Sequence, residues 1–70
     1  MEKKFLIKLI SKDLYLKTID YNDNNKVYFT DIITNAKLYD SQFEAENELF
    51  NEYYVTPYGI YSIIEVYIYL

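Results

Sequence analysis

Cysteine, histidine, arginine and tryptophan are absent from this chain of 70 residues, which has one glycine and one proline. Without cysteine the protein cannot form disulfides or the usual cysteine-rich zinc sites, which fits a reducing compartment. Without histidine it lacks the commonest base for activating a nucleophile. A single glycine cannot form a glycine-rich phosphate-binding loop. These absences predict a protein that binds a partner and has no enzymatic activity, no cofactor and no metal.

Hydrophobic residues make up 51% of the chain, and ten residues are tyrosines. This share supports folding, although a chain this short buries only about 60% of the surface that its unfolded form exposes. Tyrosine is enriched at protein interfaces because it joins a large apolar ring to a polar tip. The apolar run over residues 5–10 is interrupted by Lys8 and is too short for a signal peptide or a membrane span. We therefore expect a single domain over residues 1–70, with a cytoplasmic location and no membrane contact.

The net charge of −4 is unevenly distributed along the chain. Residues 1–17 hold five lysines and two acids, a net of +3, whereas residues 18–70 hold two lysines and nine acids, a net of −7. An acidic body suits a basic protein partner better than a nucleic acid. The simpler alternative is that the charge only maintains solubility.

Alternating apolar and polar residues predict three strands over residues 4–10, 14–21 and 26–30, and a fourth over residues 60–70. Asn and Asp tolerate positive φ, so the run Asn22-Asp23-Asn24-Asn25 predicts a tight turn between the second and third strands. Strands joined by such short connections form an antiparallel meander.

A helix is expected to begin near Ser41, because Ser41 followed three residues later by Glu44 matches a capping box. It should run to about Glu52. A period of 3.6 residues places Phe43, Ala45, Leu49, Phe50 and Tyr53 on one side, and Glu44, Asn47, Glu48, Asn51 and Glu52 on the other. The expected fold class is α+β, an antiparallel β-sheet with one helix packed on one face, in the order β-β-β-α-β.

One helix can cover only one face of this sheet. The covered face is predicted to contain Phe5, Ile7, Leu9, Leu14, Leu16, Val27, Phe29, Ile60, Ile64, Val66 and Ile68. The open face is predicted to contain Tyr15, Tyr21, Tyr28, Tyr61, Tyr67 and Tyr69, with Lys4, Lys8, Lys17, Lys26, Leu6, Ile10, Ile19 and Ile63. Monomers rarely expose large apolar patches, so this open face is predicted to be an interface. The alternatives are tyrosine stacking that only stabilises the sheet, and self-association.

Two surfaces are candidates for partner binding. On the open face, the candidate residues are Tyr15, Tyr28, Tyr61, Tyr67, Tyr69, Lys8 and Lys17. On the helix, Glu44 and Glu48 would imitate the charge of nucleic acid toward a basic pocket. The open face is the preferred candidate, because clustered aromatic side chains are frequent anchors of protein interfaces.

Two other binding sites are weighed and disfavoured. Asp20, Asn22, Asn24 and Asp31 echo the ligand spacing of a calcium-binding EF-hand loop, but the flanking residues alternate as strands do, which favours a hairpin turn. Tyrosines and lysines on an open sheet would suit single-stranded nucleic acid, since bases stack on rings and lysines meet phosphates. The net negative charge and the absence of arginine argue against nucleic acid.

The segment over residues 28–45 reads as a strand, Thr30-Asp31, an alanine, an aromatic residue, and then Asp40-Ser41 with Glu44-Ala45 opening a helix. It resembles a segment of small accessory proteins of phages and mobile elements of low-GC Gram-positive bacteria. That resemblance implies a protein that binds and disables a host protein, including CRISPR nucleases and other defence effectors. We therefore predict a non-enzymatic, phage-type accessory protein of the host cytoplasm that inhibits a defence system. The alternatives are a self-associating structural protein, as a homodimer, and a sheet that binds single-stranded nucleic acid.

Overall fold

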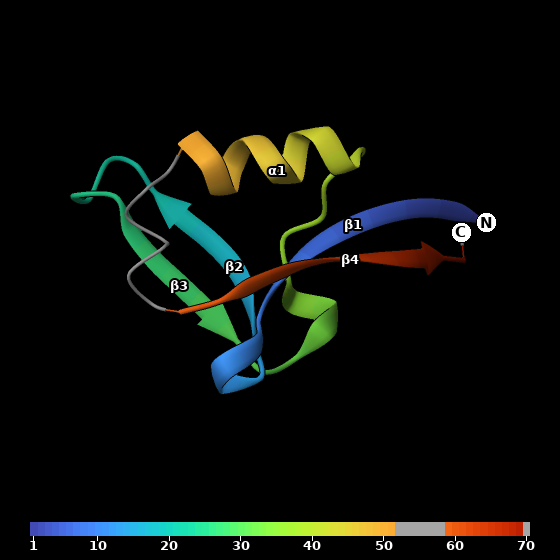
Figure 1. Cartoon of the computed structure of the whole chain (residues 1–70), viewed down its shortest axis with the longest axis horizontal. Coiled ribbons are helices and arrows are strands. Elements are labelled where there is room, and N and C mark those ends of the chain that lie inside the picture. The colour runs from blue at the N-terminus through green and yellow to red at the C-terminus, as the bar shows by residue number, and fades with distance from the viewer. Residues whose placement is uncertain (52–58, 70) are drawn as a thin grey trace.

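A four-stranded antiparallel sheet with one α-helix on one face forms the protein, as seen in a computed structural model that describes residues 1–51 and 59–69 (Figure 1). The strands are β1 (Glu2–Leu9), β2 (Leu14–Asp20), β3 (Lys26–Thr30) and β4 (Tyr61–Ile68), the helix is α1 (Gln42–Asn51), and two 3₁₀ helices are η1 (Ile10–Lys12) and η2 (Ile33–Asn35). The strand order across the sheet is β3-β2-β1-β4. The predicted α+β class and element order are confirmed, and the last strand lies beside the first.

Residues with positive φ close both hairpins. Asp13 follows η1 with φ 54°, and Asn24 and Asn25 follow β2 with φ 54° and 55°. In the second turn the backbone N–H of Asn22 donates to Asp20 Oδ1 at 3.0 Å. The predicted turn between β2 and β3 is confirmed, and because strands flank it, the segment is a hairpin and not a helix-flanked calcium loop.

The core lies between the sheet and α1. Its buried members are Ile7, Leu16, Ile19, Tyr39 and Ala45, with Phe5, Val27, Phe29, Leu49, Tyr61 and Ile63 packed against them. The burial of Ile19 was not predicted. A register shift lies in β2 between Leu16 and Thr18, and the extra residue returns Ile19 to the same face as Leu16.

The two faces of β4 are exchanged relative to the prediction. In its register with β1, Ile63 lies opposite Ile7. Directly opposed residues point to the same face of a sheet, so Ile63 and Tyr61 pack toward the core beneath α1. The residues of β4 on the other face are Ser62, Ile64, Val66 and Ile68. The predicted faces of this strand were therefore wrong: alternation shows which residues share a face, but not which face is covered.

The helix begins as predicted but is rotated about its axis. Ser41 Oγ accepts from the backbone N–H of Glu44 at 3.1 Å, and the Glu44 carboxylate accepts from the N–H of Asp40 at 3.0 Å. Ala45 is buried, whereas Phe43 and Phe50, which were predicted to face the core, are 69% and 80% exposed. The predicted helix end at Glu52, the inward position of Tyr53 and the end of the last strand at Leu70 lie outside the described residues.

The segment over residues 36–40 passes between β1 and β2. These strands pair beside η1 and then diverge. In the gap, the N–H of Lys37 donates to the Leu16 carbonyl oxygen at 2.9 Å, while Tyr39 and Phe5 exchange two backbone hydrogen bonds of 2.8 and 2.9 Å. The chain therefore crosses from η2, on one side of the sheet, to α1 on the other (Figure 1).

Gly59 occupies a position that strains any side chain. Its φ is 142°, and a Cβ atom there would lie 2.5 Å from Ser11 Oγ and 3.1 Å from Leu9 Cδ1. We expect Gly59→Ala to lower the free energy of unfolding by about 1–3 kcal/mol, because the left-handed backbone conformation adds to the close contact. Urea denaturation measures the change.

Ser11→Ala provides the control for this experiment. It removes the nearest atom, so the double variant Ser11→Ala/Gly59→Ala should recover part of the lost stability and retain the cost of the φ angle. Wild-type stability of Gly59→Ala would show that the backbone relaxes freely at this position.

Candidate functional site

Three of the predicted partner-binding residues share the sheet face opposite α1. Lys8 pairs with Tyr15, and Tyr15 in turn pairs with Thr30 of β3. The Lys8 ammonium lies 5.8 Å from the centroid of the Tyr15 ring. Tyr28 follows on the same face, with the Lys26 ammonium 5.1 Å from its ring. This cluster of two tyrosines and two lysines is the part of the predicted open face that the structure assembles.

The remaining predicted tyrosines lie elsewhere. Tyr61 packs beneath α1, and Tyr67 lies on the same side because it pairs with Lys3, two residues before the inward-facing Phe5. Tyr69 follows the end of β4 and is exposed. Lys17 is exposed at the register shift of β2. A single tyrosine surface therefore does not form, because β4 presents its aliphatic residues to the open face.

The predicted acidic face of the helix is also divided. The Glu44 carboxylate is engaged in the helix cap, as described above. The Glu48 side chain is only 12% exposed, because it turns toward the sheet instead of the solvent. The interpretation of Glu48 as part of a solvated helix face was wrong, because side chains from other elements donate hydrogen bonds to its carboxylate.

Glu48 is the acceptor at the centre of a polar cluster beneath α1. Its Oε1 accepts from Lys37 Nζ at 2.8 Å and from the Tyr39 hydroxyl at 2.5 Å. Its Oε2 accepts from the Tyr21 hydroxyl at 3.2 Å. The donors come from the segment that crosses the sheet and from the end of β2, so this one carboxylate ties α1 to both. Tyr21 was predicted on the open face and instead lies on the α1 side.

The charge states of Glu48 and Tyr39 are fixed at neutral pH. Burial raises the pKa of Glu48, but hydrogen bonds from Lys37 and Tyr39 and the Lys37 charge outweigh it and leave the pKa below its usual value. Burial, followed by the neighbouring Glu48 carboxylate, raises the pKa of Tyr39. An ionised Glu48 and a protonated Tyr39 make a stable hydrogen-bonded clamp and are not poised to exchange protons near pH 7.

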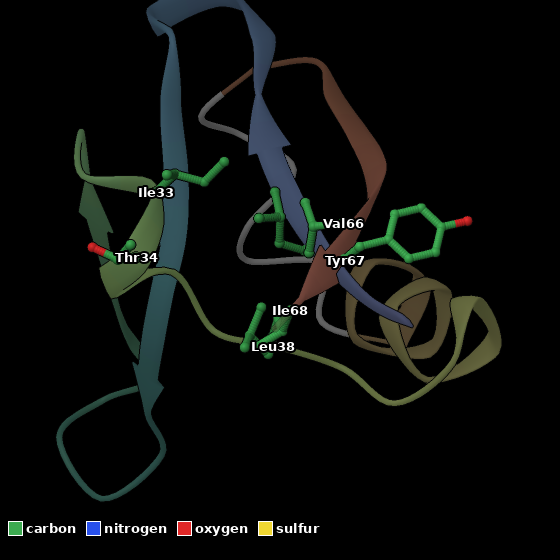
Figure 2. Close-up of a pocket in the computed structure, with 7 residues that line it drawn as sticks. Ile33, Thr34, Leu38, Val66, Tyr67 and Ile68 are labelled. Atoms are coloured by element: carbon green, nitrogen blue, oxygen red, sulfur yellow. The ribbon is translucent and has the colours of Figure 1, made fainter. Parts of the chain in front are cut away.

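An apolar groove of about 590 Å³ lies on the sheet face opposite α1. Its lining residues are Leu6, Ile33, Thr34, Leu38, Val66, Tyr67 and Ile68. Leu6 is buried, whereas Ile33 and Leu38 are 45% and 44% exposed. Figure 2 shows the Tyr67 ring pointing away from Ile33 and Leu38. At this position the backbone of β4, and not the ring, therefore borders the groove.

Charged residues lie beside one end of the groove. Lys4 pairs with Val66 across the strands and forms ion pairs with Glu2, at 2.7 Å, and with Asp40. The Asp40 side chain remains largely exposed, and the Glu2 side chain is partly exposed. Hydrogen bonds from Lys4 to both carboxylates raise the pKa of its ammonium, which therefore stays charged. Two acids against one lysine leave this end of the groove with a net negative charge.

The groove was missed from the sequence. The sequence indicates a short helical turn or loop over residues 31–36, which contain Ile33, and a brief extended piece over residues 37–39, which contain Leu38. The structure has η2 and an isolated β-bridge at Tyr39 in these places. Neither prediction brings the two residues to a common surface, and Val66 and Ile68 are predicted on the covered face. The adjacent pair Ile32-Ile33, followed by Leu38, was the available signal, because a purely solvated loop seldom carries three large aliphatic residues.

The groove and the Glu48 cluster are interpreted from this chain alone. No family model, no curated protein and no solved structure matches it. Within residues 1–51 and 59–69, no three acidic side chains are grouped as metal ligands would be. In the same ranges, no helix has the length and apolar character needed to cross a membrane. Function is therefore inferred from the shape and chemistry of the groove.

The Glu48 clamp predicts a pH-dependent stability. We expect Glu48→Gln to lower the free energy of unfolding at pH 7 by about 1–3 kcal/mol, because it removes charge-assisted hydrogen bonds from a nearly buried site. Since the folded-state pKa of Glu48 is lowered, its contribution is present above the ordinary value of 4.5 and is lost as pH falls below it. Urea denaturation at pH 7 and near pH 3 measures both effects.

Glu46→Gln is the matched control on the same helix. Glu46 accepts from Gln42 Nε2 at 3.0 Å in an exposed pair, so its replacement should change stability by less than about 0.5 kcal/mol. Equal effects of the two variants at pH 7 would exclude a special role for the clamp.

Proposed function

We propose that this chain is a non-enzymatic protein-binding module, and that its groove receives apolar side chains from a partner protein. The observation that supports this is the exposure of Ile33 and Leu38 around the buried Leu6, which forms a hollow with an aliphatic lining. Such a hollow suits the anchor side chains that contribute most of the energy at protein interfaces.

The charge around the groove supports a basic partner. Glu2 and Asp40 outnumber Lys4 at one end, and residues 18–70 carry a net charge of −7. Opposite charges steer association and select partners more than they add affinity. The partner segment is therefore proposed to carry apolar residues flanked by lysine or arginine.

The Tyr15, Tyr28, Lys8 and Lys26 cluster lies on the same sheet face as the groove, over β1, β2 and β3. Its half-exposed rings would extend the contact area beyond the groove itself. In this arrangement the aliphatic groove anchors the partner and the tyrosines form the periphery, which retains part of the predicted open-face interface.

We further propose a biological setting on the basis of the resemblance of residues 28–45 to phage and mobile-element accessory proteins. The partner would be a host protein of a low-GC Gram-positive bacterium, bound in the host cytoplasm. Binding would inhibit a defence effector such as a CRISPR nuclease. The support for this setting is the resemblance together with the small, acidic character of the chain.

Substitutions at the groove rim test the proposal. The tagged protein is used to capture partners from a nuclease-treated lysate of such a host, and the affinity for the captured protein is then measured with purified components. We expect Ile33→Ser/Leu38→Ser to weaken binding at least about tenfold, because two anchor contacts are lost. Binding should also weaken as salt rises, since the charges are screened.

Ile32→Ser is the matched control, because Ile32 is 53% exposed beside the groove and does not line it. It should retain wild-type affinity, and circular dichroism should show that all variants are folded. Equal binding by the groove variant and wild type would overturn the assignment of the groove. Capture that disappears with nuclease treatment would favour the nucleic-acid alternative.

A further inference from the structure

β4 forms an edge of the sheet, with no strand on its outer side among the described residues. Its pairing with β1 is continuous over eight positions, from Glu2 opposite Ile68 to Leu9 opposite Tyr61. The outer edge is therefore a long, regular row of backbone groups. Such an edge is a ready template for another strand.

The backbone groups that face this outer edge follow from the register. Phe5 directs its N–H and C=O to Tyr39, away from β4. Successive residues of an antiparallel strand alternate in direction, so β1 bonds to β4 through the neighbours of Phe5. The N–H of Ile10 donates to the Ile60 carbonyl oxygen at 2.9 Å, which fits the same alternation. The N–H and C=O groups that point outward from β4 therefore include those of Ile63, Glu65 and Tyr67.

β4 lacks the features that usually protect an edge strand. Natural edges are short, bulged or rich in lysine and proline. β3, at the opposite edge, has five residues, begins with Lys26 and faces the register shift of β2. β4 has eight residues, no lysine, no proline and an unbroken register. Its one charged residue, Glu65, is engaged with Lys3 at 3.3 Å.

We propose that β4 pairs with β4 of a second copy, in an antiparallel arrangement around a two-fold axis at Ile64. Backbone groups that point outward from β4 can bond only to outward-pointing groups of the second copy. Because these groups belong to every second residue, the two-fold axis must pass through a residue and not between two residues. An axis at Ile64 places Ile63 opposite Glu65 of the second copy. An axis at Glu65 uses an equally long overlap but sets two carboxylates directly opposite each other, which is destabilising.

This pairing is self-complementary on both faces of the sheet. On the face opposite α1, Ile64 meets Ile64 of the second copy, and Ser62 meets Val66 of the second copy. On the α1 side, Tyr67 lies opposite Tyr61 of the second copy, a favourable aromatic cross-strand pair. A peptide of another protein would have to supply this pattern of side chains, whereas a second copy already carries it.

The dimer would also join two grooves into one surface, because Val66 and Ile68 of each copy lie on the same face as the shared Ile64. Two linked sites bind a repeated or dimeric partner with higher avidity than one site. The pairing itself does not rest on the proposed function, since it uses the edge of β4 and not the groove.

Glu65→Pro tests the pairing. Its N–H points outward, so proline removes a bond to the second copy and leaves the bonds between β1 and β4 in place. Glu65→Ala is the control that removes the charge and keeps the N–H. Sedimentation equilibrium at concentrations from about 10 µM to about 1 mM should show a monomer–dimer equilibrium for the wild type and the control, and a monomer for Glu65→Pro.

Hydrogen exchange of the wild type keeps the test decisive if the proline variant does not fold. The amides of Ile63, Glu65 and Tyr67 should gain at least about tenfold protection as concentration rises into the dimer range, while β1 amides stay unchanged. Higher salt should strengthen the dimer, because each copy has a net charge of −4, whereas it weakens binding of a basic partner.

Three outcomes would overturn the proposal. They are a monomer at every concentration, a dimer that persists in Glu65→Pro, and protection of the three amides that does not depend on concentration. One-to-one binding of an extended peptide that protects these amides would assign the edge to a different partner. Ile33→Ser/Leu38→Ser should leave the dimer intact, so failure of the groove and failure of the edge are separable.

Discussion

The passage of residues 36–40 between β1 and β2 is the constraint on which the rest of the architecture depends. Two strands that remained paired along their full length would leave no opening, and η2 and α1 would lie on the same side of the sheet. The opening is stable because the crossing segment satisfies the backbone groups exposed at its borders, through Leu16 on one strand and Phe5 on the other. One short segment therefore determines that the helix covers one face and that a groove forms on the other.

The Glu48 clamp explains how the helix is oriented over this opening. A carboxylate near the core is costly unless donors surround it, and here Lys37, Tyr39 and Tyr21 provide them. With Glu48 and Ala45 facing inward, the geometry of the helix turns Phe43 and Phe50 to the solvent. Hydrophobicity alone would predict that Phe43 and Phe50 face the core. The polar cluster therefore determines the rotation of α1, at the expense of two exposed rings.

Local chemistry made the class, the order of elements and the hairpin turns predictable, because each depends on nearby residues such as Asn24, Asn25 and the Ser41 cap. Two features depended on distant contacts. The face of β4 is set by its register with β1, and the face of Ile19 is set by an extra residue in β2. The groove combines residues of β4, whose faces were predicted wrongly, with Ile33, Thr34 and Leu38 from the segment between β3 and α1. The tyrosine cluster of Tyr15 and Tyr28 was foreseeable because it lies within one meander.

The pairing of Glu2 with Ile68 has a consequence for the order of folding. The three-stranded meander is local in sequence and can form early, whereas the first contact between β1 and β4 must close the long loop from Leu9 to Tyr61. Before β4 pairs with β1, the crossing segment is bordered by β1 and β2, and β1 has no partner strand on its other side. Closure of this long loop is therefore expected to limit the folding rate, as non-local pairing does in other small β-rich domains. The meander would exist transiently with the edge of β1 unpaired, which is the stage most exposed to misassociation during synthesis.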